Sequence, residues 1–210
     1  MSDFNFGAER GFEAYVGYED GASSIRMFEP LTVPGLLQTP QYAVQVMKNW
    51  GVRPEAIASK LELREERKQR IAFRSPVQCY ILDEAVIRRS VGPAMREQLG
   101  HLGRMAQIPA VTIRIIPFSK GPYFAQRGPF VLLDFDGRVE KILYLESTRR
   151  GDLLITGANE QIVGLNFPKV EDPGDEVARY EAEFQCLLKL ALNPAESLEL
   201  IDSVAEELAL

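Results

Sequence analysis

Nucleophilic and metal-dependent catalysis most often need histidine or cysteine, and this chain contains few of either. It has one histidine, His101, and two cysteines, Cys79 and Cys186. A Ser-His-Asp or Cys-His unit would have to use His101, yet the sequence has no G-x-S-x-G or comparable nucleophile motif. A zinc site needs several ligands at short spacing, which these three residues do not provide. We expect no metal ion, no cofactor and no catalytic residue; a catalytic His101 is the weaker alternative to a surface or partly buried helix residue.

Phosphate-binding loops and calcium loops also lack their motifs in this sequence. Neither G-x-x-x-x-G-K-[ST] nor G-x-G-x-x-G occurs. The segment Asp134-Phe135-Asp136-Gly137 has two of the acidic residues of a calcium loop, but not its third ligand or its closing glutamate. Because Asp-Gly between two apolar runs is typical of a hairpin turn, we predict a β-hairpin there.

A cluster of basic residues is the first candidate binding feature. Arg64, Arg67 and Lys68 continue the helical face that begins with the apolar residues Ile57 and Leu61. Arginine on the inward side of a helix normally needs a carboxylate partner, so an internal ion pair is the favoured interpretation. The alternative is a site for an anion or for a partner protein.

Two further candidates are a carboxylate and an aromatic loop. Glu146 ends a predicted strand, where it could hold a ligand amine or pair with an arginine such as Arg64; the pairing is favoured. Tyr123 lies in the loop of residues 118–129, which is rich in glycine and proline. An exposed tyrosine there could line a pocket or anchor an interface, and local packing of the loop is an equal alternative.

The periodicity of apolar residues predicts the elements that must position these side chains. We expect an amphipathic segment at 4–27, an extended segment at 30–39, and helices at 41–49 and 54–73. Thr39 is the predicted N-cap of the first of these two helices, with Pro40 at its first position. The remaining predicted elements are a strand at 77–82 with a helical turn to 88, a helix from 93, strands at 111–116, 130–135, 141–146 and 153–156, a strand or hairpin about 162–167, and two C-terminal helices. This order predicts an α+β fold with N-terminal helices, a small antiparallel β-sheet and two C-terminal helices.

The net charge of −6 is unevenly distributed along the 210 residues. Residues 171–210 contain eleven acidic and two basic residues, so residues 1–170 carry a net charge of +3. The isoelectric point near 5.0 argues against direct nucleic-acid binding, since phosphate contacts need a basic face. The sequence contains no apolar run of roughly 18 residues and no signal peptide, so we expect no membrane association and a cytoplasmic location.

Several motifs, taken in order, resemble a known family. The segment Val33-Pro34-Gly35-Leu36-Leu37-Gln38-Thr39, followed by Tyr42-Ala43, is similar to the "vPGLLQT-x-x-YA" signature of a domain of unknown function in actinobacterial regulators. That domain typically follows an Xre-type helix-turn-helix, and its members include WhiJ-like and antitoxin-like proteins. The resemblance runs from about residue 13 to 206 and includes Leu82-Asp83-Glu84-Ala85-Val86, Gln98-Leu99, Tyr144-Leu145-Glu146 and Asn193-Pro194-Ala195-Glu196-Ser197.

The resemblance implies an effector domain that associates with a small partner protein or a full-length helix-turn-helix regulator, or that senses a small molecule; a homodimer is also compatible with it. The family's usual DNA-binding domain is absent from the sequence, so we expect residues 1–28 to be a helical remnant of the linker to it and residues 29–210 to be the effector domain. Residues 157–173 are extra relative to the family pattern. The candidate ligand- or partner-binding residues are Gln38, Tyr42, Arg64, Arg67, Glu84, Tyr123 and Glu146.

Two functional hypotheses follow. The favoured one is a regulatory binding module, antitoxin-like or transcriptional, that does not itself bind DNA. The alternative is an enzyme of a small-molecule biosynthetic pathway, recruited from the same fold, in which carboxylates and arginines supply acid-base groups without histidine.

Overall fold

The computed structural model describes residues 6–123, 128–137, 141–147, 150–155, 161–163 and 173–208. The side chain of Glu146 lies outside this description, as do residues 157–160 and 164–172 of the extra segment. Everything below refers to the described residues.

A mixed β-sheet forms the centre of the structure. Its seven described strands lie in the order β3-β2-β1-β4-β5-β6-β7. β1, β2 and β3 run parallel to one another, and every pairing from β1–β4 outward to β7 is antiparallel. The strands are β1 (Ser24–Glu29), β2 (Val77–Asp83), β3 (Val111–Ile116), β4 (Phe130–Asp134), β5 (Ile142–Ser147), β6 (Arg150–Ile155) and β7 (Gln161–Val163).

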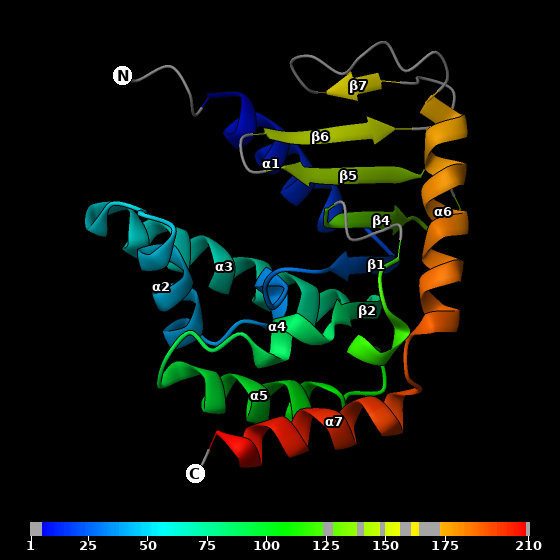
Figure 1. Ribbon diagram of the computed structural model, residues 1–210. Coiled ribbons are helices and arrows are strands. Elements are labelled where there is room, and N and C mark those ends of the chain that lie inside the picture. Colours follow the sequence, from blue (N-terminus) through cyan, green and yellow to red (C-terminus); the bar gives the residue numbers. More distant parts are fainter. Residues whose placement is uncertain are drawn as a thin grey trace.

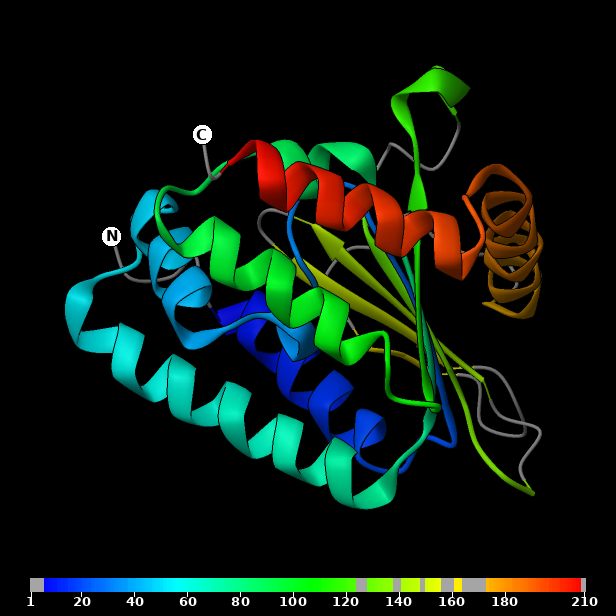
Figure 2. The same ribbon diagram turned by 90° about the horizontal axis from the view of Figure 1, so that it is seen from below.

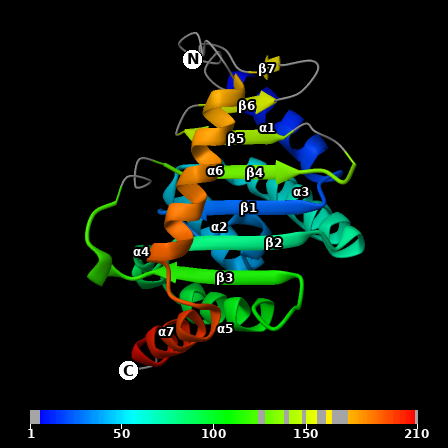
Figure 3. The same cartoon turned by 90° about the vertical axis from the view of Figure 1, so that its right-hand side faces the viewer.

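Helices cover both faces of this sheet. The described helices are α1 (Phe6–Glu19), α2 (Pro40–Asn49), α3 (Pro54–Arg74), α4 (Glu84–Arg88), α5 (Ala94–Met105), α6 (Pro173–Leu190) and α7 (Pro194–Glu207), with short 3-10 turns at Gly35–Leu37 and Phe118–Lys120. α6 crosses one face alone, whereas α1, α2 and α3 lie on the other (Figure 1 and Figure 3). Viewed from below, α5 and α7 lie side by side on the same side as α3 (Figure 2).

Each face of the sheet has its own apolar core. The larger core lies under α1, α2, α5 and α7 and includes Tyr15, Ile25 and Leu99. The smaller one lies under α6, where Phe184 packs against Phe130 of β4 with ring centroids 6.3 Å apart. This two-sided packing buries β1 and β2 on both faces, which is the usual setting of parallel strands.

The predicted α+β class and the two C-terminal helices are confirmed, but the predicted antiparallel sheet is wrong because the sheet is mixed. One source of the error is β1, whose residues were predicted to belong to a helical segment. A strand buried on both faces shows no clean alternation, and β1 also carries Arg26. The Arg26 guanidinium forms ion pairs with the carboxylates of Asp134 (N–O distance 2.9 Å) and Glu181 (3.1 Å). β2 has a parallel neighbour on each side, β1 on one and β3 on the other.

The predicted boundary between residues 28 and 29 falls inside β1. This strand pairs with β2 on one side and β4 on the other, so it lies in the middle of the sheet. α1, just before it, packs against β6. Residues 12–28 are therefore part of the same folded unit as the residues that follow them.

The capping signal at Thr39 and Pro40 predicted the start of α2 correctly. The Thr39 hydroxyl accepts a hydrogen bond from the backbone N–H of Tyr42, and Pro40 occupies the first position of α2. At α7, Asn193 and Glu196 form a reciprocal capping box. The first of these caps orients the segment that precedes α2, and that segment forms the floor of the groove described next.

Candidate functional site

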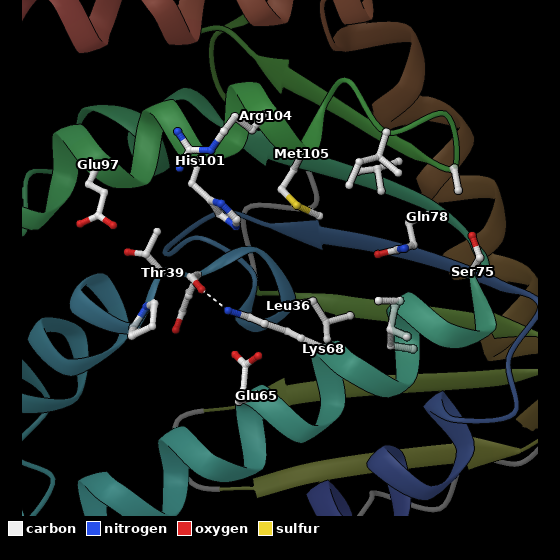
Figure 4. Close-up of a pocket in the computed structure, with 17 residues that line it drawn as sticks. Leu36, Thr39, Glu65, Lys68, Ser75, Gln78, Glu97, His101, Arg104 and Met105 are labelled. Atoms are coloured by element: carbon white, nitrogen blue, oxygen red, sulfur yellow. Dashed lines mark hydrogen bonds between the residues drawn. The ribbon is translucent and has the colours of Figure 1, made fainter.

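A groove of about 580 Å³ lies between α3 and α5, over the segment that joins β1 to α2 (Figure 4). Helix α3 forms one wall and helix α5 the other, while the starts of β2 and β3 close the inner end. The residues that line the groove are Leu36, Gln38, Thr39, Pro40, Glu65, Lys68, Ile71, Ala72, Ser75, Gln78, Glu97, His101, Arg104, Met105, Ile108, Ala110 and Val111.

The floor of the groove is held to α5 by one buried glutamine. Gln98 is fully buried, and its amide nitrogen donates to the carbonyl oxygen of Leu37 at 2.7 Å. Its amide oxygen accepts from the backbone N–H of Thr39, also at 2.7 Å. An extended chain has backbone groups that no helix or sheet satisfies, and a buried amide side chain can satisfy two of them at once. Gln98 therefore fixes the position of the floor relative to the α5 wall.

Gln38 and Tyr42, two candidates from the sequence, both help to build this floor. The Gln38 amide nitrogen donates to the carbonyl oxygen of Val33 at 2.7 Å, which orients the amide and leaves its oxygen without a donor in the described part of the chain. The Tyr42 hydroxyl accepts from the backbone N–H of Val33 at 3.2 Å. Tyr42 is buried and lies outside the groove, whereas Gln38 lines it. Gln38 thus lines the groove, while its buried amide oxygen has no donor among the described residues.

Two half-buried nitrogen groups face each other across the groove. His101 points from α5 toward α3, and Lys68 extends from α3 to the floor, where it donates to the carbonyl oxygen of Gln38 (Figure 4). Burial lowers the pKa of Lys68. Burial also lowers the pKa of His101, and the nearby positive charges of Lys68 and Arg104 lower it further. Both effects favour the neutral form of the His101 ring, which has no hydrogen-bond partner among the described residues.

Charged side chains lie at one end and at the centre of the groove. Glu65 and Glu97 lie toward the end near Thr39, with Lys68 and His101 closer to the centre (Figure 4). Toward the inner end the polar side chains of Ser75 and Gln78 lie with Met105 (Figure 4). The other apolar side chains of the lining include Ile71, Ala72, Ile108, Ala110 and Val111. Such a pocket, mostly apolar with a few converging polar groups, is typical of small-molecule sites.

The lone histidine makes the electrostatics of the groove measurable. The pKa of His101 is expected below the 6.5 of a free histidine, and Lys68→Gln is expected to raise it because a neighbouring positive charge is removed. A histidine whose pKa is depressed by folding adds stability above pH 6.5, and this stability is lost as the pH falls through the folded pKa. The imidazole NMR resonances, followed against pH in untagged protein, report the value directly. A pKa at or above 6.5, or one unchanged in Lys68→Gln, would contradict the described geometry.

A smaller hollow of about 380 Å³ adjoins the groove between α2 and α3. It shares Gln38, Lys68 and Glu65 with the groove and adds Leu61 and Arg64. The Arg64 guanidinium donates to the carbonyl oxygen of Lys60 at 3.1 Å. Of the predicted site residues, the structure thus brings Gln38 and Arg64 to this connected pair of hollows.

Arg67 lies on another face of α3 and forms a buried ion pair. Its guanidinium donates two hydrogen bonds of 2.9 Å to the carboxylate of Glu19, at the end of α1. Tyr15 also donates to Glu19, and burial raises the pKa of Tyr15 well above its usual value, with the Glu19 charge adding to the effect. The guanidinium carbon of Arg67 lies 5.1 Å from the centre of the Phe12 ring. The favoured expectation of an internal ion pair is confirmed for Arg67.

Glu84 and Tyr123 lie at the other end of the parallel strands, away from the groove. Glu84 accepts from Arg88 at 2.6 Å and from the backbone N–H of Phe118 at 2.7 Å. The Tyr123 hydroxyl donates to the carboxylate of Asp83 at 2.5 Å. These contacts hold α4 and the chain after β3 in place, and they do not bring either residue to the groove.

Four polar residues of α5 that line or build the groove were not predicted as binding residues from the sequence. Glu97, His101 and Arg104 follow one another at helical spacing, so they share a face. That spacing was the available signal, but it is also typical of a solvated helix surface. Gln98, between Glu97 and His101, was noted only as part of the Gln98-Leu99 motif of the family resemblance. No local pattern indicated its role, because its two partners are 59 and 61 residues away along the chain.

Two negative findings apply to the described residues. Among them, no group of three or more His, Cys, Asp or Glu side chains is arranged to hold a metal ion. None of the helices they form combines the length and the hydropathy that crossing a bilayer requires.

The fold and the groove together define an α+β domain on a mixed sheet, with a cleft between two helices of one face. The chain belongs to the family described as a domain of unknown function (DUF5753), which matches residues 12–163. The matched region includes both walls and the floor of the groove and ends at β7, before α6 and α7. No curated protein matches the chain.

Proposed function

We propose that this protein is a regulatory binding module that takes a small molecule in the groove between α3 and α5. The observation that carries the proposal is the groove itself, whose 580 Å³ falls within the usual range for ligand pockets. Among the described residues, the half-buried side chain of His101 lines it without a hydrogen bond or ion pair. Buried or half-buried polar groups normally have hydrogen-bond partners. A ligand that supplies such a partner would therefore be stabilised in the groove.

Helix α3 supports a regulatory role because it connects the groove to α1. Lys68 faces the groove, while the preceding residue, Arg67, is tied to Glu19 at the end of α1. A ligand that displaces α3 would therefore act on the Arg67–Glu19 pair and change how firmly α1 is held. In ligand-controlled switches generally, the ligand shifts the populations of two conformations by binding one of them more tightly.

The partner that we propose for this module is a small protein or a full-length helix-turn-helix regulator, as the resemblance to antitoxin-like regulators implies. Phe73, at the end of α3, is 90% exposed, and Val77, at the start of β2, is also exposed. Exposed apolar side chains that form a contiguous patch mark interfaces, and these two side chains are where we propose that the partner docks. The isoelectric point near 5.0 supports a role without direct DNA contact, and a cytoplasmic location is part of the same proposal.

The test is ligand-dependent stabilisation by fractions of a small-molecule extract. Ala72 is an exposed residue of α3 that lines the groove, so Ala72→Phe would fill it. Ala58→Phe, also exposed on α3 but outside both hollows, is the matched control. A ligand at a hundredfold excess over its Kd adds about 2.7 kcal/mol, or roughly 5–10 °C in Tm for a chain of this size. We expect a fraction that raises the Tm of the wild type and of Ala58→Phe but not that of Ala72→Phe; equal shifts in all three would overturn the proposal.

The second candidate is an enzyme of a small-molecule pathway. One observation favours it: Lys68 and His101, whose pKa values are both lowered, lie in the same groove. Perturbed titratable groups in a cleft are typical of acid-base catalysts. The two candidates differ in the fate of the ligand, since mass spectrometry after incubation would recover it unchanged from a sensor and converted from an enzyme.

A further inference from the structure

We infer that the ligand of the groove carries a carboxylate bound by Lys68 and His101, with an apolar body along the inner end. This inference rests on the groove being the ligand site proposed above, and it adds the chemical class of the ligand. It derives from the positions of hydrogen-bond donors, apolar side chains and charges around the groove.

The centre of the groove is rich in donors. A lysine ammonium has three N–H groups, and Lys68 uses one of them on the carbonyl oxygen of Gln38. The other two have no acceptor among the residues that the structure describes. A neutral imidazole adds one more N–H, and His101 likewise has no acceptor in the described ranges. A carboxylate accepts at two oxygens, so it matches this pair, and hydrogen bonds with charged partners are the stronger ones.

The inner end of the groove fits an apolar body. Ile71 and Ala72 of α3 line the groove together with Met105, Ile108 and Val111, and Ser75 and Gln78 are the polar side chains at this end (Figure 4). Burying apolar surface contributes roughly 25 cal/mol per Å², so an apolar tail placed here adds affinity while the polar head stays at the centre. The donor pair at the centre, together with a lining that is otherwise mostly apolar, therefore favours an amphipathic acid over a uniformly polar ligand.

The charges around His101 determine how binding depends on pH. Lys68 and Glu65 face the groove from α3, and Glu97 and Arg104 face it from α5; the floor segment contributes no charged side chain to the lining. Glu65 and Glu97 are exposed, so they are better screened than the half-buried Lys68–His101 pair. A carboxylate beside His101 favours its protonated form and raises its pKa. Binding therefore takes up a proton and becomes tighter as the pH falls from 8 toward 6.

The experiment compares three probes with the same chain and different head groups: octanoate, octylamine and octan-1-ol. Untagged protein is titrated with each, and the imidazole NMR resonances of the lone histidine report both occupancy and the pKa of His101. We expect octanoate to bind, octylamine not to bind, and octanol to bind at least roughly tenfold more weakly than octanoate, because it lacks the charge. With octanoate the pKa of His101 is expected to rise by roughly one unit.

Variants distinguish the binding mode from unspecific adsorption of the tail. Lys68→Gln is expected to weaken octanoate binding roughly tenfold or more and to weaken octanol binding much less, because octanol carries no charge. Ala72→Phe is expected to abolish both, and Ala58→Phe neither. Equal or tighter binding of octylamine or octanol, an unchanged pKa of His101, or no binding of any probe would each overturn the carboxylate assignment. The extract experiment tests separately whether the groove is the ligand site. If a fraction without any acid stabilises the wild type but not Ala72→Phe, the groove is still the ligand site and only the carboxylate assignment fails.

Discussion

Arg67→Met is expected to lower the free energy of unfolding by about 3–5 kcal/mol, the usual cost of removing one partner of a buried ion pair. Glu19 is only 2% exposed and Arg67 only 7%, and the two hydrogen bonds between them measure 2.9 Å. Without the guanidinium, the carboxylate keeps only the Tyr15 hydroxyl as a donor among the described side chains. Urea denaturation followed by circular dichroism measures the change.

Two further variants test whether the loss comes from the unpaired charge. Arg70→Met removes an exposed pair with Glu66 (3.5 Å) on the same helix and should cost roughly 0.5 kcal/mol or less. The double variant Arg67→Met/Glu19→Met should recover part of the loss, because no buried carboxylate is left without a partner. A loss below about 1 kcal/mol for Arg67→Met would show that this pair does not hold α1 to α3, and would remove the route by which α3 is proposed to act on α1.

Gln98→Leu is expected to cost about 2–4 kcal/mol and to abolish stabilisation by any groove ligand. Leucine has a similar volume, so the change removes the amide without leaving a large cavity. The carbonyl oxygen of Leu37 and the N–H of Thr39 would then be buried without partners, each at a penalty of about 1–3 kcal/mol. The floor would also lose its attachment to α5, so the distance between the floor and the α5 wall would no longer be fixed.

The matched control is Gln107→Leu, an exposed glutamine just beyond α5, whose replacement should change stability by about 0.5 kcal/mol or less. Urea denaturation and the extract experiment, applied to both variants, give the two readouts. A Gln98→Leu protein that keeps wild-type ligand stabilisation would show that the floor does not need this attachment to define the site.

Much of the fold was predictable because its signals are local. Thr39-Pro40 and the Asn193 capping box mark helix starts through contacts within four residues, and Asp136-Gly137 marks the turn between β4 and β5, where Gly137 adopts a φ of +68°. β1 was missed because its environment is non-local. Arg26 looks like a surface residue until Asp134 and Glu181, more than a hundred positions away, are brought beside it.

The candidate site was predictable only in part, for the same reason. The PGLLQT segment attracted attention to Gln38, and the basic stretch to Arg64 and Arg67, but the sequence could not show which face of α3 each residue takes up in the fold. The opposite wall comes from α5, whose Glu97, His101 and Arg104 carry no binding motif. Only the packing of α5 opposite α3 turns these polar side chains into one wall of a groove.

The central claim is that the α3–α5 groove is where this protein binds its ligand, and the imidazole resonances of His101 test it most directly. The measurement adds the most stabilising fraction of the small-molecule extract to wild type, Ala58→Phe and Ala72→Phe, and records those resonances. The account predicts that they move in the first two proteins and stay in place in the third. A fraction that stabilises the wild type while leaving the His101 resonances unchanged would place the ligand elsewhere and contradict the claim.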